Sequence, residues 1–173
     1  AEGIDTAYLE KLQSERNKEE VVTSKILFMG DVMLARSIGS SIVAGDNPFK
    51  FVQPVLDQHD VQVANIETTI ADASFAQSAA KPYTFNAPLE SLSTLKNAGI
   101  DVSSLANNHT GDFGREATAN TIDQLANAGL VSVGAGKNSA EAFAPKLVES
   151  NGINIAFIAV NDIELAHTKV SDT

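Results

Sequence analysis

The chain has 173 residues, of which 43% are hydrophobic, and this length and composition fit one globular domain with a substantial core. Its formal net charge is −10, which disfavours non-specific nucleic-acid binding because such binding requires a positive surface. It contains no cysteine, which excludes disulfides, thiolate zinc sites and cysteine nucleophiles. No apolar run reaches the ~18 residues of a membrane-spanning helix.

The first 24 residues differ from the rest of the chain because they are highly charged and contain few apolar residues. They predict a polar linker or a surface helix over 1–24. We expect one folded domain over 25–173.

Short apolar runs alternate with helical segments from Lys25 onward, which predicts an α/β fold with a partly parallel, mixed sheet. Helices are expected to end at Gly99 and Gly129. Asn151-Gly152, between two apolar runs, predicts a two-residue hairpin. The buried strands are expected at 25–29, 61–65, 101–106 and 130–136.

An internal repeat supports this assignment. Residues 95–108 and 125–138 align at a spacing of 30 residues, and each contains a helix, the tripeptide Asn-Ala-Gly and a strand. A spacing of this length is typical of successive βαβ units in one sheet.

Polar side chains follow three of the predicted strands. Asp31 follows the first, Glu67 the second, and Asn108 with His109 the third. Taken singly, each is better explained as a turn or surface residue. Because ligands bind at the carboxyl ends of parallel strands, we expect these four side chains to converge on one edge of the sheet.

This set of side chains favours a particular chemistry. Oxygen and nitrogen ligands without thiolate favour Mn, Mg, Fe or Zn. Hydrolases with two such ions use them to activate water and to neutralise charge on the attacked group. His109, beside the ions, can protonate a leaving group, and Asp112 can orient its imidazole. A serine hydrolase with a Gly-Asp-Ser-Leu motif is disfavoured, because Val32 stands in place of the serine.

Five motifs occur in an order that resembles the bacterial capsule-synthesis protein family of the CapA/PgsA type, which is associated with poly-γ-glutamate biosynthesis. The resemblance covers residues 25–163, and the ordered set is more specific than any single motif. The motifs are KILFMGDVMLAR (25–36), VANIETTI (63–70), KPYTFNAP (81–88), LKNAGIDVSSLANNHTGDFG (95–114) and GAGKN (134–138).

This family is similar to the calcineurin-like metallophosphoesterases, which have a four-layer αββα sandwich and a site for two metal ions. The resemblance implies that Asp31, Glu67 and Asn108 are metal ligands, with Glu67 in place of the bridging aspartate. It implies that His109 is the acid for the leaving group, next to Asp112.

Three further residues match the motifs and are expected to bind substrate. They are Asn65, Asn107 and Arg36, although Arg36 is equally well explained as a surface arginine on a helix. The expected substrate is an anionic polymer or a phosphoester.

The family's later histidine motifs have no counterpart here, and His167 in ELAHTKV does not match them. We therefore expect an N-terminal part of a longer catalytic domain, with an incomplete metal site and no activity of its own.

The resemblance also implies a membrane-anchored, extracytoplasmic protein at the cell surface, with residues 1–24 as its stalk and with membrane-bound capsule-synthesis partners. Two functions remain open. The protein is a metal-dependent hydrolase, or it is a non-catalytic module that binds or guides the nascent polymer.

Overall fold

The computed structural model of the chain describes residues 6–16, 21–75 and 80–163. His167 and the end of the predicted domain lie outside these ranges. In chain order the elements are α1 (Thr6–Arg16), β1 (Ile26–Val32), α2 (Arg36–Val43), α3 (Gln53–Leu56), β2 (Val61–Ile66), β3 (Thr69–Ile70), β4 (Asn86–Ala87), α4 (Glu90–Ala98), β5 (Val102–Ser104), α5 (Gly114–Asn127), β6 (Val131–Val133), α6 (Ser139–Ala142), β7 (Lys146–Ser150) and β8 (Ile153–Phe157).

The central sheet has the strand order β1-β2-β5-β6, and each of its pairings is parallel. The antiparallel pair β7-β8 forms a separate two-stranded sheet, and β3 and β4 form a short parallel pair that the sequence did not predict. The predicted α/β class is confirmed. None of the helices in the described part of the chain is long and apolar enough to cross a lipid bilayer.

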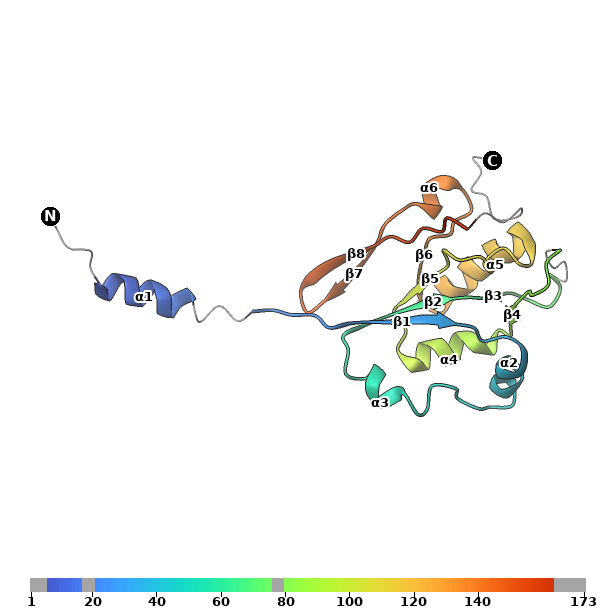
Figure 1. Cartoon of the computed structure of the whole chain (residues 1–173), viewed down its shortest axis with the longest axis horizontal. Coiled ribbons are helices and arrows are strands. Elements are labelled where there is room, and N and C mark those ends of the chain that lie inside the picture. Colours follow the sequence, from blue (N-terminus) through green and yellow to red (C-terminus); the bar gives the residue numbers. More distant parts are fainter. Residues whose placement is uncertain (1–5, 17–20, 76–79, 164–173) are drawn as a thin grey trace.

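The two faces of the central sheet are covered differently. Side chains of β2 at alternate positions, Ala64 and Ile66, share a core with residues of α2, α3, α4 and α5. Val61 and Val63, at the other set of alternate positions, pack with Phe157 and its neighbours in the β7-β8 hairpin. Figure 1 shows α4 and the hairpin on opposite sides of the sheet. The result is a layer of helices, a parallel sheet and a hairpin on its second face.

A β-bulge in β1 sets which side chains face each layer. Phe28 pairs with Val63, but Asp31 pairs with Asn65, so β1 has one extra residue between the two pairs. Gly30 lies within the bulge at φ +73°, a left-handed conformation that glycine adopts without a steric penalty. The strand does not end at residue 29 as predicted, because the bulge lets it continue to Val32.

The predicted repeat is confirmed in its backbone geometry. Helices α4 and α5 are each followed by a glycine at positive φ, Gly99 and Gly129. The amide of Ile100 donates to the carbonyl of Leu95 at 3.1 Å, and the amide of Leu130 donates to that of Leu125 at 2.9 Å. Each repeat therefore ends its helix in the same way and enters the next strand of the sheet.

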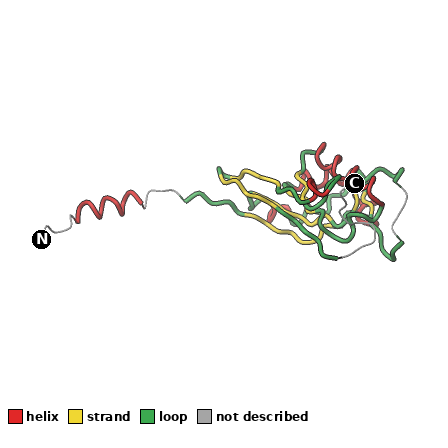
Figure 2. Tube along the Cα trace, turned by 90° about the horizontal axis from the view of Figure 1, so that it is seen from above, coloured by secondary structure: helices red, strands yellow, loops and turns green. Residues whose placement is uncertain are grey.

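The N-terminal segment reaches the hairpin. Figures 1 and 2 show α1 apart from the sheet. Closer to β1, the side-chain amide of Asn151 donates to the carbonyl of Thr23 at 2.8 Å, and the hydroxyls of Ser24 and Ser150 are 2.7 Å apart. Asn151 and Gly152 have φ of 52° and 76°, as the predicted two-residue turn requires.

Gly134 provides a test of packing at the ends of the strands. Its φ is +82°, and an added Cβ would lie 2.6 Å from the Cβ of Ala106 and 2.9 Å from that of Ala159. We expect Gly134→Ala to lower the free energy of unfolding by the steric penalty of left-handed backbone, roughly 1–2 kcal/mol, and by a further 1–3 kcal/mol or so for overpacking.

The matched control is Gly152→Ala, which has φ +76° but no atom within 4 Å of the added Cβ. Urea unfolding of both variants separates the cost of the left-handed backbone, which both share, from the cost of overpacking, which only Gly134→Ala has. Equal losses of stability would contradict the close packing around Gly134.

Candidate functional site

The carboxyl ends of three neighbouring strands meet at one edge of the central sheet. Asp31 of β1 pairs with Asn65 of β2, and Asn65 pairs with Ser104 of β5. The amide of Glu67 donates to the carbonyl of Val32 at 3.0 Å, which places the residue after β2 next to the end of β1. The sheet register therefore brings these strand ends together, as the sequence predicted.

Hydrogen bonds between side chains connect the three strand ends. The side-chain amide of Asn65 donates to a carboxylate oxygen of Asp31 at 2.7 Å. The amide of Asn107 donates to the side-chain oxygen of Asn65 and to the carbonyl of Ile66, both at 2.9 Å. Because the oxygen of each asparagine accepts while its nitrogen donates, the chain Asp31–Asn65–Asn107 has a fixed direction.

Asn107 also shapes the loop that follows it. Its side-chain oxygen accepts from the amide of His109 at 2.9 Å and from the hydroxyl of Thr110 at 3.2 Å. Because Asn107 is buried, its polar atoms are shielded from water and need these partners within the protein. Asn65 and Asn107 thus hold the site together, and their expected contact with substrate stays a prediction.

His109 and Asp112 form a hydrogen-bonded pair. Nδ1 of His109 is 2.9 Å from a carboxylate oxygen of Asp112, and the amide of Phe85 donates to the same oxygen at 2.7 Å. The side chain of Asp112 is fully buried. Because a carboxylate only accepts, Nδ1 carries the proton of this bond and Nε2 is left for other chemistry.

Two residues of the site were not predicted from the sequence. Lys81 places its ammonium against the carboxylate of Asp112 and 2.7 Å from the carbonyl of Asn108. The ring of Phe85 lies 4.3 Å from the ring of His109. Both belong to the KPYTFNAP motif, which carried the family resemblance without a role for these residues. The sequence signal that could have identified them is the placement of Lys81, Tyr83 and Phe85 at alternate positions, which in an extended segment lie on one side.

Arg36 lies close to this group. Its guanidinium carbon is 4.6 Å from the ring centre of Phe85 and 5.4 Å from that of Tyr83, distances at which a cation is attracted to an aromatic face. Arg36 begins α2 with φ of 55°, which is uncommon for a residue other than glycine. The residue is exposed, so the structure agrees with a surface arginine and leaves its contact with substrate a prediction.

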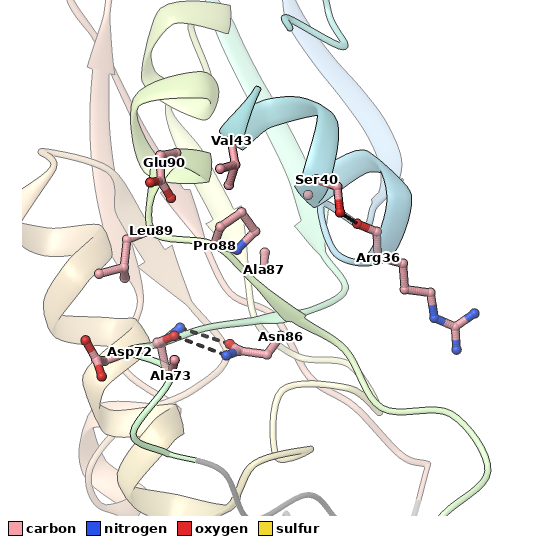
Figure 3. Close-up of a pocket in the computed structure, with 12 residues that line it drawn as sticks. Arg36, Ser40, Val43, Asp72, Ala73, Asn86, Ala87, Pro88, Leu89 and Glu90 are labelled. Carbon is pink, nitrogen blue, oxygen red and sulfur yellow. Dashed lines mark hydrogen bonds between the residues drawn. The ribbon is translucent and has the colours of Figure 1, made fainter. Parts of the chain in front are cut away.

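A pocket of about 640 Å³ lies next to Arg36, between α2, β4 and the start of α4. Figure 3 shows that the side chain of Arg36 points away from the other lining residues. Asn86 lines it and exchanges two hydrogen bonds with the backbone of Ala71, each at 3.1 Å. Asp72, another lining residue, accepts from the amide of Ser74 at 2.8 Å, and this bond lowers the pKa of its carboxyl group.

The predicted metal ligands have suitable chemistry but form an incomplete set. Asp31 is exposed, and Glu67 and Asn108 are half-buried. Their side chains offer oxygen atoms, which suit a hard divalent ion. Within the described ranges, no three histidine, cysteine, aspartate or glutamate side chains are grouped so that they could hold a metal ion. Any full metal shell therefore needs ligands in addition to these.

The fold and the site define an α/β protein whose polar site lies at the carboxyl ends of a parallel sheet. The chain belongs to the bacterial capsule synthesis protein PGA_cap family, whose profile matches residues 25–173. This confirms the family resemblance of the sequence motifs.

Individual relatives agree with this assignment. The chain is 31% identical over 142 residues to the capsule biosynthesis protein CapA of Bacillus anthracis, covering 80% of this chain and 34% of CapA. It is 42% identical over 78 residues to a probable polyglutamine synthesis accessory protein of Mycobacterium tuberculosis, covering 44% of this chain and 20% of that protein. The chain thus spans about a third or less of the length of these relatives.

Asn107 allows a test of the hydrogen-bonded edge. We expect Asn107→Asp to lower the free energy of unfolding by about 3 kcal/mol, because carboxylate oxygens would face two acceptors, on Asn65 and Ile66, that lose their donor. Chemical denaturation measures the loss.

Asn108→Asp is the matched control, because its half-buried side chain makes no hydrogen bond to any other residue that the structure describes. We expect it to change stability by less than about 1 kcal/mol. The proposed role of Asn107 is wrong if both variants unfold at the same denaturant concentration.

Proposed function

We propose that this chain acts in capsule polymer synthesis of the poly-γ-glutamate type, and that it carries part of a calcineurin-like, metal-dependent hydrolase site. Family membership supports the first part. The second part depends on one observation, the His109–Asp112 pair, which hydrogen bonds through Asn107 and Asn65 connect to the carboxylate of Asp31.

Asp31, Glu67 and Asn108 would hold two divalent ions of Mn, Mg, Fe or Zn, together with ligands from outside the described residues. Bound ions of this kind activate water and offset negative charge on a phosphoester. The hydrogen bond from Asn65 occupies only one carboxylate oxygen of Asp31 and leaves the other for an ion. The surplus of acidic residues, 22 against 12 basic residues, also favours attraction of cations.

His109 would give a proton to the leaving group. Its Nδ1 is bonded to Asp112, so the imidazole is held in one orientation and Nε2 is the nitrogen that can donate. The ring of Phe85 packs against it and limits its rotation. Arg36, beside Phe85, would attract an anionic polymer or phosphoester to the same edge.

The cellular setting is also a proposal, and it is supported by the family. We place the protein outside the cytoplasm, anchored at the cell surface and working with membrane-bound capsule-synthesis partners. In this setting residues 1–24 would link the anchor to the domain.

The hydrolase proposal is tested in the full-length product of the gene that encodes this chain. The probe is bis-p-nitrophenyl phosphate with added Mn²⁺, and bound metal is measured by mass spectrometry. We expect Asp31→Ala to lose both metal and hydrolysis, because it removes a ligand. His109→Gln should keep its metal and lose roughly 10²–10⁴-fold in rate, the usual contribution of a general acid.

The control is Asp123→Ala, which removes an exposed carboxylate that pairs with Lys137 outside the site. It should retain both metal and rate. A protein with Asp31→Ala that keeps its metal content and its activity would contradict the proposal.

A non-catalytic module that binds or guides the nascent polymer is the second candidate. It is favoured by the absence, within the described ranges, of three grouped acidic or histidine side chains. A full-length product without stoichiometric metal, which still sediments with poly-γ-glutamate after His109→Ala, is the result expected for this function. Two bound metal ions per full-length protein would exclude it.

A further inference from the structure

The segment 81–85 contributes to the site, although the proposed reaction assigns no role to Lys81. Its alternate side chains contact residues of the site. Lys81 reaches Asp112 and Asn108, and Phe85 packs on His109. Within this segment Lys81 carries the only charge, and its side chain is 19% exposed.

The ammonium of Lys81 balances a buried charge. The side chain of Asp112 has no exposed surface, and a buried carboxylate is costly unless a cation compensates it. One oxygen of Asp112 accepts from His109 and from the amide of Phe85. The other oxygen lies against the ammonium of Lys81. Asp112 is therefore held through both oxygens, by two hydrogen bonds at one and by the ion pair at the other.

The same ammonium also holds the loop on the other side of the ring. It donates to the carbonyl of Asn108 at 2.7 Å and lies 3.3 Å from Nδ1 of His109. Because Nδ1 donates its proton to Asp112, it has no lone pair for the ammonium, which donates to the carbonyl of Asn108 and forms an ion pair with Asp112. Lys81 thus holds two groups that flank the His109 ring, the carbonyl of Asn108 and the carboxylate of Asp112.

We infer that Lys81 is a positioning residue of this site: by holding Asp112 and the carbonyl of Asn108, its ammonium sets the orientation and the protonated nitrogen of the His109 ring. The inference rests on the proposed function, since it gives the general acid its fixed geometry. A lysine with only a structural role would stabilise the fold without controlling the Nδ1–H bond of His109.

The test observes the ring directly in this chain, labelled with ¹⁵N-histidine, by NMR at one fixed pH. The chain has three histidines, and His109→Gln assigns the signal of residue 109. We expect a downfield Nδ1–H resonance of His109 that is protected from exchange with water. Lys81→Met should broaden or abolish this resonance while thermal unfolding shows that the chain remains folded.

The control is Lys137→Met, which removes another lysine that is bonded to an aspartate, at 2.7 Å from Asp123. It should leave the His109 resonance unchanged. If Lys81→Met does not fold, the same Nδ1–H resonance is measured in Lys81→Gln, which keeps N–H donors but removes the charge. An unchanged resonance in a folded Lys81 variant overturns the inference. Absence of hydrolysis by the full-length product would instead overturn the proposed function, whatever the resonance shows.

Discussion

The site depends on the parallel register of β1, β2 and β5. The extra residue at Gly30 reverses the alternation of β1, so that Val32 packs with the helices and Asp31 faces the same side as Asn65. Without this bulge Asp31 would point into the layer of helices, where a carboxylate would have no solvent. The bonds from Asp31 through Asn65 to Asn107 follow directly from this register.

The part of the architecture that local signals encode was predicted correctly. The turn at Asn151-Gly152 and the helix ends at Gly99 and Gly129 each depend on a glycine or asparagine with positive φ, a property that residue type reveals. The meeting of the strand ends followed from the general geometry of parallel sheets. The edge of the sheet that carries Asp31 and Asn107 could therefore be located before any coordinates were known.

The remaining part depends on contacts that the sequence does not encode locally. Lys81 reaches Asp112, which lies 31 positions further along the chain, and the alternation within its own segment does not identify a buried carboxylate as its partner. The same holds for Arg36, whose guanidinium lies over the ring of Phe85 because α2 packs near β4, which follows Phe85 in the chain. Asn65 and Asn107 matched the family motifs, but only the structure reveals that their amides bond to each other.

The attachment of the N-terminal segment to the hairpin has a mechanical consequence. Thr23 and Ser24 bond to Asn151 and Ser150 just before the chain enters β1. Tension applied at residue 21 would first act on these two contacts and then along β1, where it would shear several backbone bonds to β2 together. Strands loaded in shear resist force better than strands that unzip. Force applied from the N-terminal side would therefore be resisted first by the contacts with the hairpin, at the end of β1 that lies away from Asp31.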